Sequence, residues 1–354
     1  MATQPPSQET NLLGEGVNQI CQKSNKKTQV GKNTYACIEF DQRSGVLSLD
    51  EEVEKSQEWC MQKLLGVVDI GTSSIKISVF ECSEAGCKQV NFEGIDVRIA
   101  DKSSAMISRS RRDLAIKTIQ NLISFGQRSG AVDIICIATH AIRSAENARD
   151  FLAEVKAKCG LDVNVLSGCE EAALICNSIG NIERTENFFS FDVGGGSVEF
   201  NLFEGVRVFS ASRGIGAISL AEILHNGHLE SPLDCITQVV RENMDDIPIP
   251  RQDAKIICTG GCLSIAKTFL SASDGKTASL VNLKSLFEKI APMNVADRLA
   301  FGIPEGRVDI FDTALGIAIA VLSQIGRDGV TISEASVRHG AALGHISFEQ
   351  RWPR

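Results

Sequence analysis

Apolar and polar positions follow a regular order from residue 64 to about residue 346. Short apolar runs that suit buried strands alternate there with stretches whose apolar residues recur at helical spacing. Residues 1–63 lack this order, and only 35–40 and 46–49 alternate like short strands around a turn. We therefore predict that residues 1–63 form a largely flexible N-terminal extension with one marginal hairpin.

The ordered part predicts an α/β protein. Strand patterns occur at 64–71, 74–81, 90–99, 132–139, 163–166, 207–212 and 255–258, and a strand-turn-strand unit at 188–205. Helical patterns occur at 108–130, 147–160, 169–179, 231–245, 263–270, 309–325 and 333–346. Strands that alternate with helices in this way indicate mostly parallel sheets with α/β crossovers.

The strand-turn-strand unit is present twice. Asp69-Ile70-Gly71 in the first copy matches Asp192-Val193-Gly194 in the second, and Ser74 matches Ser197 at the same offset. An internal repeat of this kind indicates two domains of related topology.

The repeated glycine turns suggest a phosphate-binding cleft. Glycine permits φ > 0 and a close approach of the backbone to a ligand, and converging N–H groups with Ser74 and Ser197 would form an anion site. Asp69 and Asp192 would face the same phosphate, an arrangement that makes sense mainly with Mg²⁺ between them. A third corner, Gly260-Gly261, opens a helix and offers another phosphate contact. The alternative is a pair of purely structural hairpins.

The paired turns and the Gly-Gly corner resemble the actin-like ATPase and sugar kinase superfamily, and more narrowly the exopolyphosphatase/guanosine pentaphosphate phosphatase (Ppx/GppA) family. The resemblance rests on DIGTSSIKI at Asp69, ATHAIRSAENARDFL at Ala138, VLSGCEEAALI at Val165, DVGGGSVEF at Asp192, RGIGAISL at Arg213, CTGGCLSIA at Cys258 and VRHGAALG at Val337. It implies two actin-like (ribonuclease H-like) domains with a cleft between them. Domain I would hold 64–168 and 337–354, and domain II 169–336.

The resemblance also implies hydrolysis of a terminal phosphoanhydride, with orthophosphate released from inorganic polyphosphate. Glu170 would be the general base, and Arg143 would clamp the phosphate. Asp69, Asp192 and Glu199 would bind Mg²⁺ or orient it together with its water. The phosphate would be held by Gly71, Ser73, Ser74, Lys76, Gly194, Gly195, Gly196, Ser197, Gly260 and Gly261. For Glu170, its neighbour Glu171 and Arg143, the plainer interpretation is a charge at a helix start.

The chain departs from the family pattern in the two turns. Ser73 stands where Asn is usual, Lys76 where Arg is usual, and Val198 where Thr is common. Lysine keeps the positive charge but loses the bidentate fork of arginine, which weakens the phosphate grip or alters substrate preference.

Charge and cysteine content narrow the function classes. The 44 acidic and 36 basic residues give a net charge of −8, which argues against a protein whose whole surface binds nucleic acid or membrane but leaves a local basic patch open. Residues 97–143 nevertheless carry eight basic and three acidic side chains, which suit either a polyphosphate channel or ordinary solvated helix faces. The twelve cysteines contain no CxxC, and the closest pairs are Cys82/Cys87 and Cys258/Cys262. We interpret them as small buried hydrophobic residues.

Location and partners follow from the same observations. No apolar run reaches the roughly 20 residues of a membrane span, and the N-terminus lacks the pattern of a signal peptide, so a cytoplasmic protein is expected. The expected ligand is inorganic polyphosphate or guanosine penta- or tetraphosphate, and a homodimer stays open. The alternatives are a pppGpp 5′-phosphohydrolase and a non-catalytic sensor of phosphorylated nucleotides. A sugar kinase is disfavoured by the Glu pair that follows Ser167-Gly168.

Overall fold

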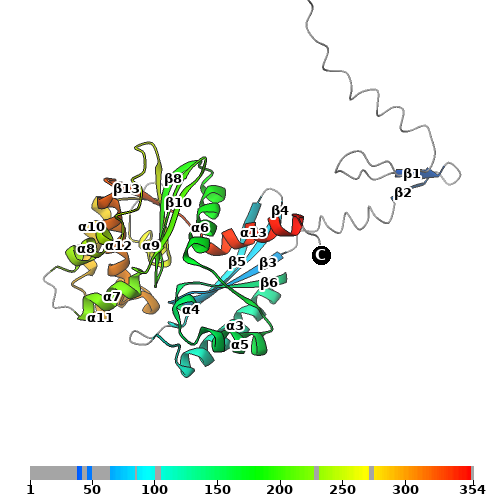
Figure 1. The fold of residues 1–354 in the computed structure, drawn as a ribbon, viewed down its shortest axis with the longest axis horizontal. Helices are drawn as coiled ribbons and strands as arrows, with labels where there is room; N and C mark the ends of the chain where they lie inside the picture. Colours follow the sequence, from blue (N-terminus) through cyan, green and yellow to red (C-terminus); the bar gives the residue numbers. More distant parts are fainter. Residues whose placement is uncertain are drawn as a thin grey trace, which may run out of the picture. The chain divides into compact units, whose positions relative to one another are not determined.

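The computed structural model describes residues 38–41, 46–49, 64–83, 86–99, 105–226, 231–270 and 275–351, in two units, 1–61 and 62–354 (Figure 1). In the first unit β1 (Ile38–Asp41) and β2 (Val46–Leu49) pair antiparallel, where alternation predicted a hairpin. The rest of the predicted flexible extension lies outside the described residues.

The second unit contains two sheets of related topology. The first has the order β5-β4-β3-β6-β7 and the second β10-β9-β8-β11-β13-β12. The first sheet consists of β3 (Leu64–Ile70), β4 (Ser74–Ser83), β5 (Gly86–Asp96), β6 (Ala131–Ala138) and β7 (Val163–Val165). The second consists of β8 (Asn187–Val193), β9 (Val198–Glu204), β10 (Val206–Arg213), β11 (Lys255–Thr259), β12 (Thr277–Ser279) and β13 (Gly329–Ile332).

The repeat extends from sequence to strand register. In each sheet an antiparallel three-strand meander is followed by two strands that run parallel to its first strand. The second sheet adds β12, which pairs antiparallel with β13. Both sheets are therefore mixed, and the expectation of mostly parallel sheets is wrong. Asp69 of β3 lies opposite Lys76 of β4, and Asp192 of β8 lies opposite Glu199 of β9. The two copies therefore place their aspartates and the facing side chains at equivalent positions.

The helices cover the sheets and supply the crossovers. They are α3 (Arg109–Arg128), α4 (His140–Ser144), α5 (Ala148–Cys159), α6 (Gly168–Glu183), α7 (Ala217–Asn226), α8 (Pro232–Glu242), α9 (Gly261–Ala266), α10 (Leu280–Ile290), α11 (Val295–Phe301), α12 (Phe311–Gln324) and α13 (Val337–Arg351), with a 3₁₀ turn, η1 (Glu305–Arg307). The pattern did not predict α4, α7, α10, α11, β12 or β13. It also extended the last helix back to residue 333, although α13 begins only at Val337, after β13 and its connection.

Two helices lie between the sheets. The α13 helix packs against β3, β4 and β5, and α6 packs against β9, β10 and α13 (Figure 1). Around them a single apolar cluster joins the sheets, with Phe80 from the first, Phe188 from the second, Ile175 from α6 and Ala342 from α13. The predicted domain boundaries at residues 168 and 336 adjoin these two helices and stay a prediction.

The α6–α13 contact depends on a glycine. A Cβ added to Gly340 of α13 would lie 2.0 Å from the backbone oxygen of Leu174 in α6, whereas one added to Gly344 would meet nothing within 4 Å. The missing side chain at Gly340 therefore sets how closely the two helices approach.

We expect Gly340→Ala to lower the free energy of unfolding by about 1–3 kcal/mol, because the added methyl group overpacks the helix contact. Gly344→Ala in the same helix is the matched control, and its better helix propensity should leave stability unchanged or raise it by up to about 1 kcal/mol. Urea denaturation of both variants measures this. Equal stability of the two variants would contradict the packing described.

Candidate functional site

The two repeated turns meet. A Cβ added to Gly195 would lie 2.4 Å from Ser73 Oγ, and one added to Gly196 would lie 2.7 Å from Thr72 Oγ1. Neither Gly71 nor the glycines at 194–196 have φ in the left-handed region; among the turn glycines Gly260 does, with φ of 126°. Glycine is thus needed in the paired turns for close approach, and not for the positive φ that the sequence suggested.

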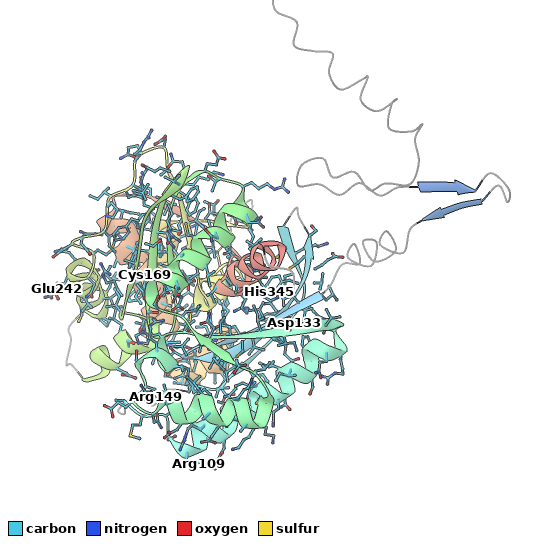
Figure 2. The ribbon with its side chains drawn as sticks, turned by 45° about the vertical axis from the view of Figure 1, so that its right-hand side comes forward. Arg109, Asp133, Arg149, Cys169, Glu242 and His345 are labelled. Carbon is cyan, nitrogen blue, oxygen red and sulfur yellow. The ribbon has the colours of Figure 1, made fainter. Side chains whose placement is uncertain are left out.

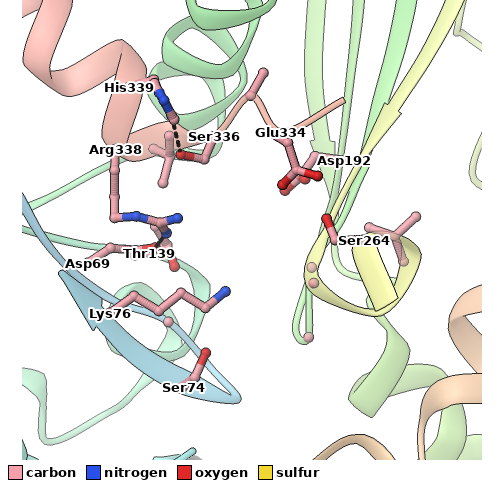
Figure 3. Close-up of a pocket in the computed structure, with 18 of the residues that line it drawn as sticks. Asp69, Ser74, Lys76, Thr139, Asp192, Ser264, Glu334, Ser336, Arg338 and His339 are labelled. Atoms are coloured by element: carbon pink, nitrogen blue, oxygen red, sulfur yellow. Dashed lines mark hydrogen bonds and ion pairs between the residues drawn. The ribbon is translucent and has the colours of Figure 1, made fainter. Parts of the chain in front are cut away.

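A cavity of about 840 Å³ opens where the turns meet, lined from both sheets (Figure 3). It brings together most of the residues predicted for the site, namely Asp69, Gly71, Ser73, Ser74, Lys76, Asp192, Gly194, Gly195, Gly196, Ser197, Gly260 and Gly261. Three predicted residues do not line it: Arg143, Glu170 and Glu199.

Of the five cationic side chains that line the cavity, three come from α13, η1 and β4. Arg338 at the start of α13 donates from Nη1 to Asp69 Oδ2 at 3.0 Å and from Nε to Ser78 Oγ at 2.8 Å. Arg307 of η1 donates to Ser74 Oγ at 3.3 Å. Neither arginine was predicted for the site from the sequence. Arg338 stands inside a quoted motif, VRHGAALG, and Arg307 in none.

Lys76 carries the third positive charge. Its ammonium group points into the cavity (Figure 3) and forms no hydrogen bond or ion pair within the described part of the chain. Burial, and next the positive charge of Arg338, lower the pKa of Lys76 to about 8. Lys76 is half-buried, and a partly desolvated cation that forms no ion pair is costly, so the position favours a bound anion.

The two neighbouring glutamates at the start of α6 have different environments. Ser167 and Glu170 form a capping box: Ser167 N donates to Glu170 Oε2 at 2.8 Å, and Glu170 N donates to Ser167 Oγ at 3.2 Å. Glu170 is exposed, and the hydrogen bond from the Ser167 backbone lowers its pKa. The Ser-x-x-Glu spacing is itself a sequence signature of this cap, and could have separated the two.

Glu171, one residue later, lines the cavity. Its side chain is buried, with 6% of the residue exposed, and Arg143 donates from Nη1 to Glu171 Oε2 at 3.0 Å. Arg143 also donates to the Leu166 carbonyl at 2.7 Å, which fixes the guanidinium. Burial raises the pKa of Glu171 to about 7, although the bond from Arg143 opposes this shift. Glu171 therefore lines the cavity, and Arg143 contacts it without lining the cavity itself.

The remaining carboxylates, half-buried Asp192 and buried Glu199, lie around the second turn. Asp192 accepts a hydrogen bond from Thr259 Oγ1, and burial raises its pKa. Glu199 is 1% exposed and accepts a hydrogen bond from Ser212 Oγ at 2.7 Å. Burial, followed by the charges of Glu171 and Asp192, raises the pKa of Glu199 well above its ordinary value.

The carboxylate oxygens at this site suit a hard cation such as Mg²⁺. Asp69 Oδ1 and Glu199 Oε2 are buried oxygens with no hydrogen-bond partner among the described residues. No three Asp, Glu, His or Cys side chains in the part that the structure describes converge tightly enough to hold a metal by themselves. Mg²⁺ is commonly bound by one or two carboxylates together with substrate phosphates and water, and Asp69 and Asp192 both line the cavity.

The basic segment at 97–143 does not form a channel here. None of its described basic residues lines the cavity. Arg109 lies on the outer face of α3 (Figure 2) and pairs with Asp113, and Arg112 pairs with Glu154. Arg109, Lys117 and Arg128 are exposed on α3, whereas Arg98, Arg111, Arg112 and Arg143 are half-buried and hydrogen-bonded.

Beside the cavity, ion pairs also connect η1 and the residues that follow it to the end of β5. Arg307 Nη1 lies 2.6 Å from Asp96 Oδ1 at the end of β5. Arg98, two residues after Asp96, pairs with Asp309. These contacts hold η1, and with it Arg307, against the first sheet.

Comparison with known proteins gives a family match and a fold match. A family model described as the Ppx/GppA phosphatase family matches residues 78–348. Exopolyphosphatase 1 of Mycobacterium tuberculosis H37Rv is 28% identical over 140 residues, 38% of this chain and 41% of that protein. Exopolyphosphatase 1 of Mycobacterium leprae is 27% identical over 142 residues, 39% of this chain and 42% of that protein. The chain thus matches less than half the length of these relatives.

Two solved structures share the fold. An exopolyphosphatase from Cytophaga hutchinsonii superposes with a TM-score of 0.70 at 19% identity and covers 81% of this chain and 98% of that chain. The Ppx/GppA family member from Aquifex aeolicus gives 0.68 at 18% identity, again over 81% and 98%. The predicted α/β fold of two actin-like domains is confirmed. In the described residues no helix is long and apolar enough to cross a membrane.

The contact between Arg143 and Glu171 predicts how Glu171 titrates. Arg143→Met removes the bond that stabilises the carboxylate, so the pKa of Glu171 should rise above about 7. Arg143→Lys keeps the positive charge and should change the value less. NMR titration of the protein with ¹³C-labelled glutamate measures both, and an unchanged pKa in Arg143→Met would show that the contact is not formed in solution.

Proposed function

Because the chain belongs to the Ppx/GppA phosphatase family, we propose that it hydrolyses the terminal phosphoanhydride bond of inorganic polyphosphate and releases orthophosphate. One observation carries the proposal. A single cavity combines two facing glycine turns, a lysine without a counter-ion and a buried glutamate whose pKa is about 7.

The turns and the cations would bind the terminal phosphate. Backbone N–H groups of the residues at 71–74 and 194–197 offer donors on both sides of the cavity. Lys76, Arg307 and Arg338 neutralise the charge of the phosphate oxygens. Phosphoryl transfer requires mainly positioning and charge stabilisation from the protein, and this arrangement supplies both.

Glu171 is the candidate general base in place of Glu170. Its carboxylate accepts the proton of a water molecule that attacks the terminal phosphorus, and the bond from that phosphorus to the bridging oxygen breaks. The shortened chain leaves with its electron pair on that oxygen, and Glu171 returns the proton to solvent. A base whose pKa lies near the operating pH is suited to this task. Arg143 keeps the carboxylate oriented.

Asp69 and Asp192 would hold Mg²⁺. When bound, the ion supplies positive charge to the oxygens of the phosphoanhydride. Glu199 lies behind Asp192, so its part would be to shape the charge around Asp192 from a buried position.

Guanosine pentaphosphate is the second candidate substrate. Phe92 is 48% exposed and lines the same cavity, with the Arg338 guanidinium carbon 5.6 Å from its ring centroid. An exposed aromatic face beside phosphate-binding cations is what a nucleobase needs for stacking.

Phosphate release measured side by side from long polyphosphate and from pppGpp, with Mg²⁺ present, tests the proposal. Faster release from polyphosphate supports it. Preferential release from pppGpp would move the activity to the second candidate. Saturable binding with no release from either compound would identify a sensor of phosphorylated nucleotides.

The two glutamates form a matched pair of variants. Glu171→Gln should reduce kcat on the preferred substrate by about 10²-fold or more, because it removes the base but keeps the size of the side chain. Glu170→Gln loses charge at an exposed helix cap and should keep kcat within a few-fold. Steady-state phosphate release measures both, and the reverse order of effects would return the role to Glu170.

The pH profile should depend on Glu171 and Lys76. Glu171 acts when deprotonated, so kcat/KM should rise as pH passes about 7. Lys76 binds phosphate when protonated, so kcat/KM should fall as pH passes about 8. Lys76→Arg keeps its charge at all these pH values and should remove the alkaline limb alone. An alkaline limb that persists in Lys76→Arg would assign it to another group.

A further inference from the structure

Two cysteines face each other beside the cavity. Cys82 near the end of β4 and Cys87 near the start of β5 are direct partners across the antiparallel pair. Their sulfur atoms lie 2.7 Å apart. Both side chains are half-buried, and Cys87 lines the cavity. The sequence analysis noted this spacing only as a near pair of buried thiols.

We propose that Cys82 and Cys87 form a reversible disulfide, a redox modification site on the wall of the cavity. Opposed residues of an antiparallel pair have Cα atoms about 4.5 to 5.5 Å apart. A disulfide bridges Cα separations of about 4.4 to 6.8 Å, with sulfur atoms about 2.05 Å apart. The bond therefore needs small side-chain rotations and no change of strand register.

The chemistry requires a hydroperoxide or a disulfide as the oxidant. With hydrogen peroxide, the Cys82 thiolate attacks one oxygen to give a sulfenic acid and water, and the Cys87 sulfur then displaces the hydroxyl as a second water. Two thiols lose two hydrogens, and the peroxide gains them. The hydrogen bond from Cys87 lowers the pKa of Cys82, which favours Cys82 as the attacking thiolate.

The other described cysteines lack this arrangement. Cys136, Cys258 and Cys262 are buried, and burial raises the pKa of each thiol. Among the described residues no second pair of sulfur atoms is in contact. Among the described cysteines, formation of an intramolecular disulfide should therefore be selective for Cys82 and Cys87.

The site is connected to the cavity through β5. This strand forms one edge of the first sheet, and its residues Cys87, Lys88 and Phe92 line the cavity. A disulfide would tie this wall to β4, which also carries Lys76. The inference rests on the strand pairing and the sulfur contact, and it stands whether or not the proposed function is correct.

Peptide mapping of the oxidised full chain tests the bond. The protein is treated with hydrogen peroxide or glutathione disulfide, its free thiols are alkylated in denaturant, and it is digested with trypsin. Cleavage after Lys76 and Lys88 gives one peptide, 77–88, that contains both cysteines and no third. We expect this peptide to resist alkylation, to be lighter than the dithiol by two hydrogens, and to recover both thiols with dithiothreitol. Oxidation of the exposed Cys169 shows that enough oxidant was present. If the 77–88 peptide is still fully alkylated under those conditions, the proposal is overturned.

Variants and exchange measurements complete the test. In Cys87→Ser, Cys82 can no longer pair with Cys87 and should instead form a mixed disulfide with glutathione. Cys235→Ser removes a half-buried cysteine of α8 and should leave the yield of the Cys82–Cys87 disulfide unchanged. Hydrogen exchange of the β5 amides should slow severalfold on oxidation of the wild type and stay unchanged in Cys87→Ser. Equal exchange rates in both redox states would show that the disulfide does not hold β5, and with it this wall of the cavity, against β4.

Discussion

Buried charge in the cavity constrains the rest of the structure. Asp69 on β3 and Arg338 on α13 form an ion pair at 3.0 Å, about one-tenth of each side chain being exposed. Loss of one partner from such a pair typically costs about 3–5 kcal/mol, because the other charge is left uncompensated. The pair therefore holds α13 against β3, directly opposite the position on β4 from which Lys76 reaches the cavity. Glu171 and Asp192 line the same cavity and Glu199 lies beside it, and burial raises the pKa of all three carboxyl groups.

The fold makes this concentration of charge possible. Two sheets of the same strand order present equivalent turns, and the glycines let those turns touch. Behind them α6 and α13 pack at a glycine contact and share one apolar cluster with both sheets. The elements that join the sheets thus begin with site residues, Glu171 in the first turn of α6 and Arg338 in that of α13.

The repeat at Asp69 and Asp192 was enough to predict the two related sheets and the meeting of their turns, because strand-turn-strand units are local in sequence. The choice between Glu170 and Glu171 depended on which carboxylate the Ser167 cap takes, a detail the helix pattern alone does not resolve. Arg307 and Arg338 reach the cavity from elements more than 200 residues from Ser74 and Asp69, so no local motif placed them. The basic count at 97–143 could not separate a channel from solvated helix faces, because a count along the sequence does not say which way each side chain points.

Under the proposed function, a water molecule activated in this cavity attacks the terminal phosphorus of a phosphoanhydride. Hydrolysis of polyphosphate in H₂¹⁸O, with Mg²⁺ and with the released orthophosphate analysed by mass spectrometry, tests this most directly. The account predicts one atom of ¹⁸O in each orthophosphate released in a single turnover and none in the shortened chain. Label in the shortened chain, or orthophosphate without label, would place the broken bond or the attacking group elsewhere and contradict it.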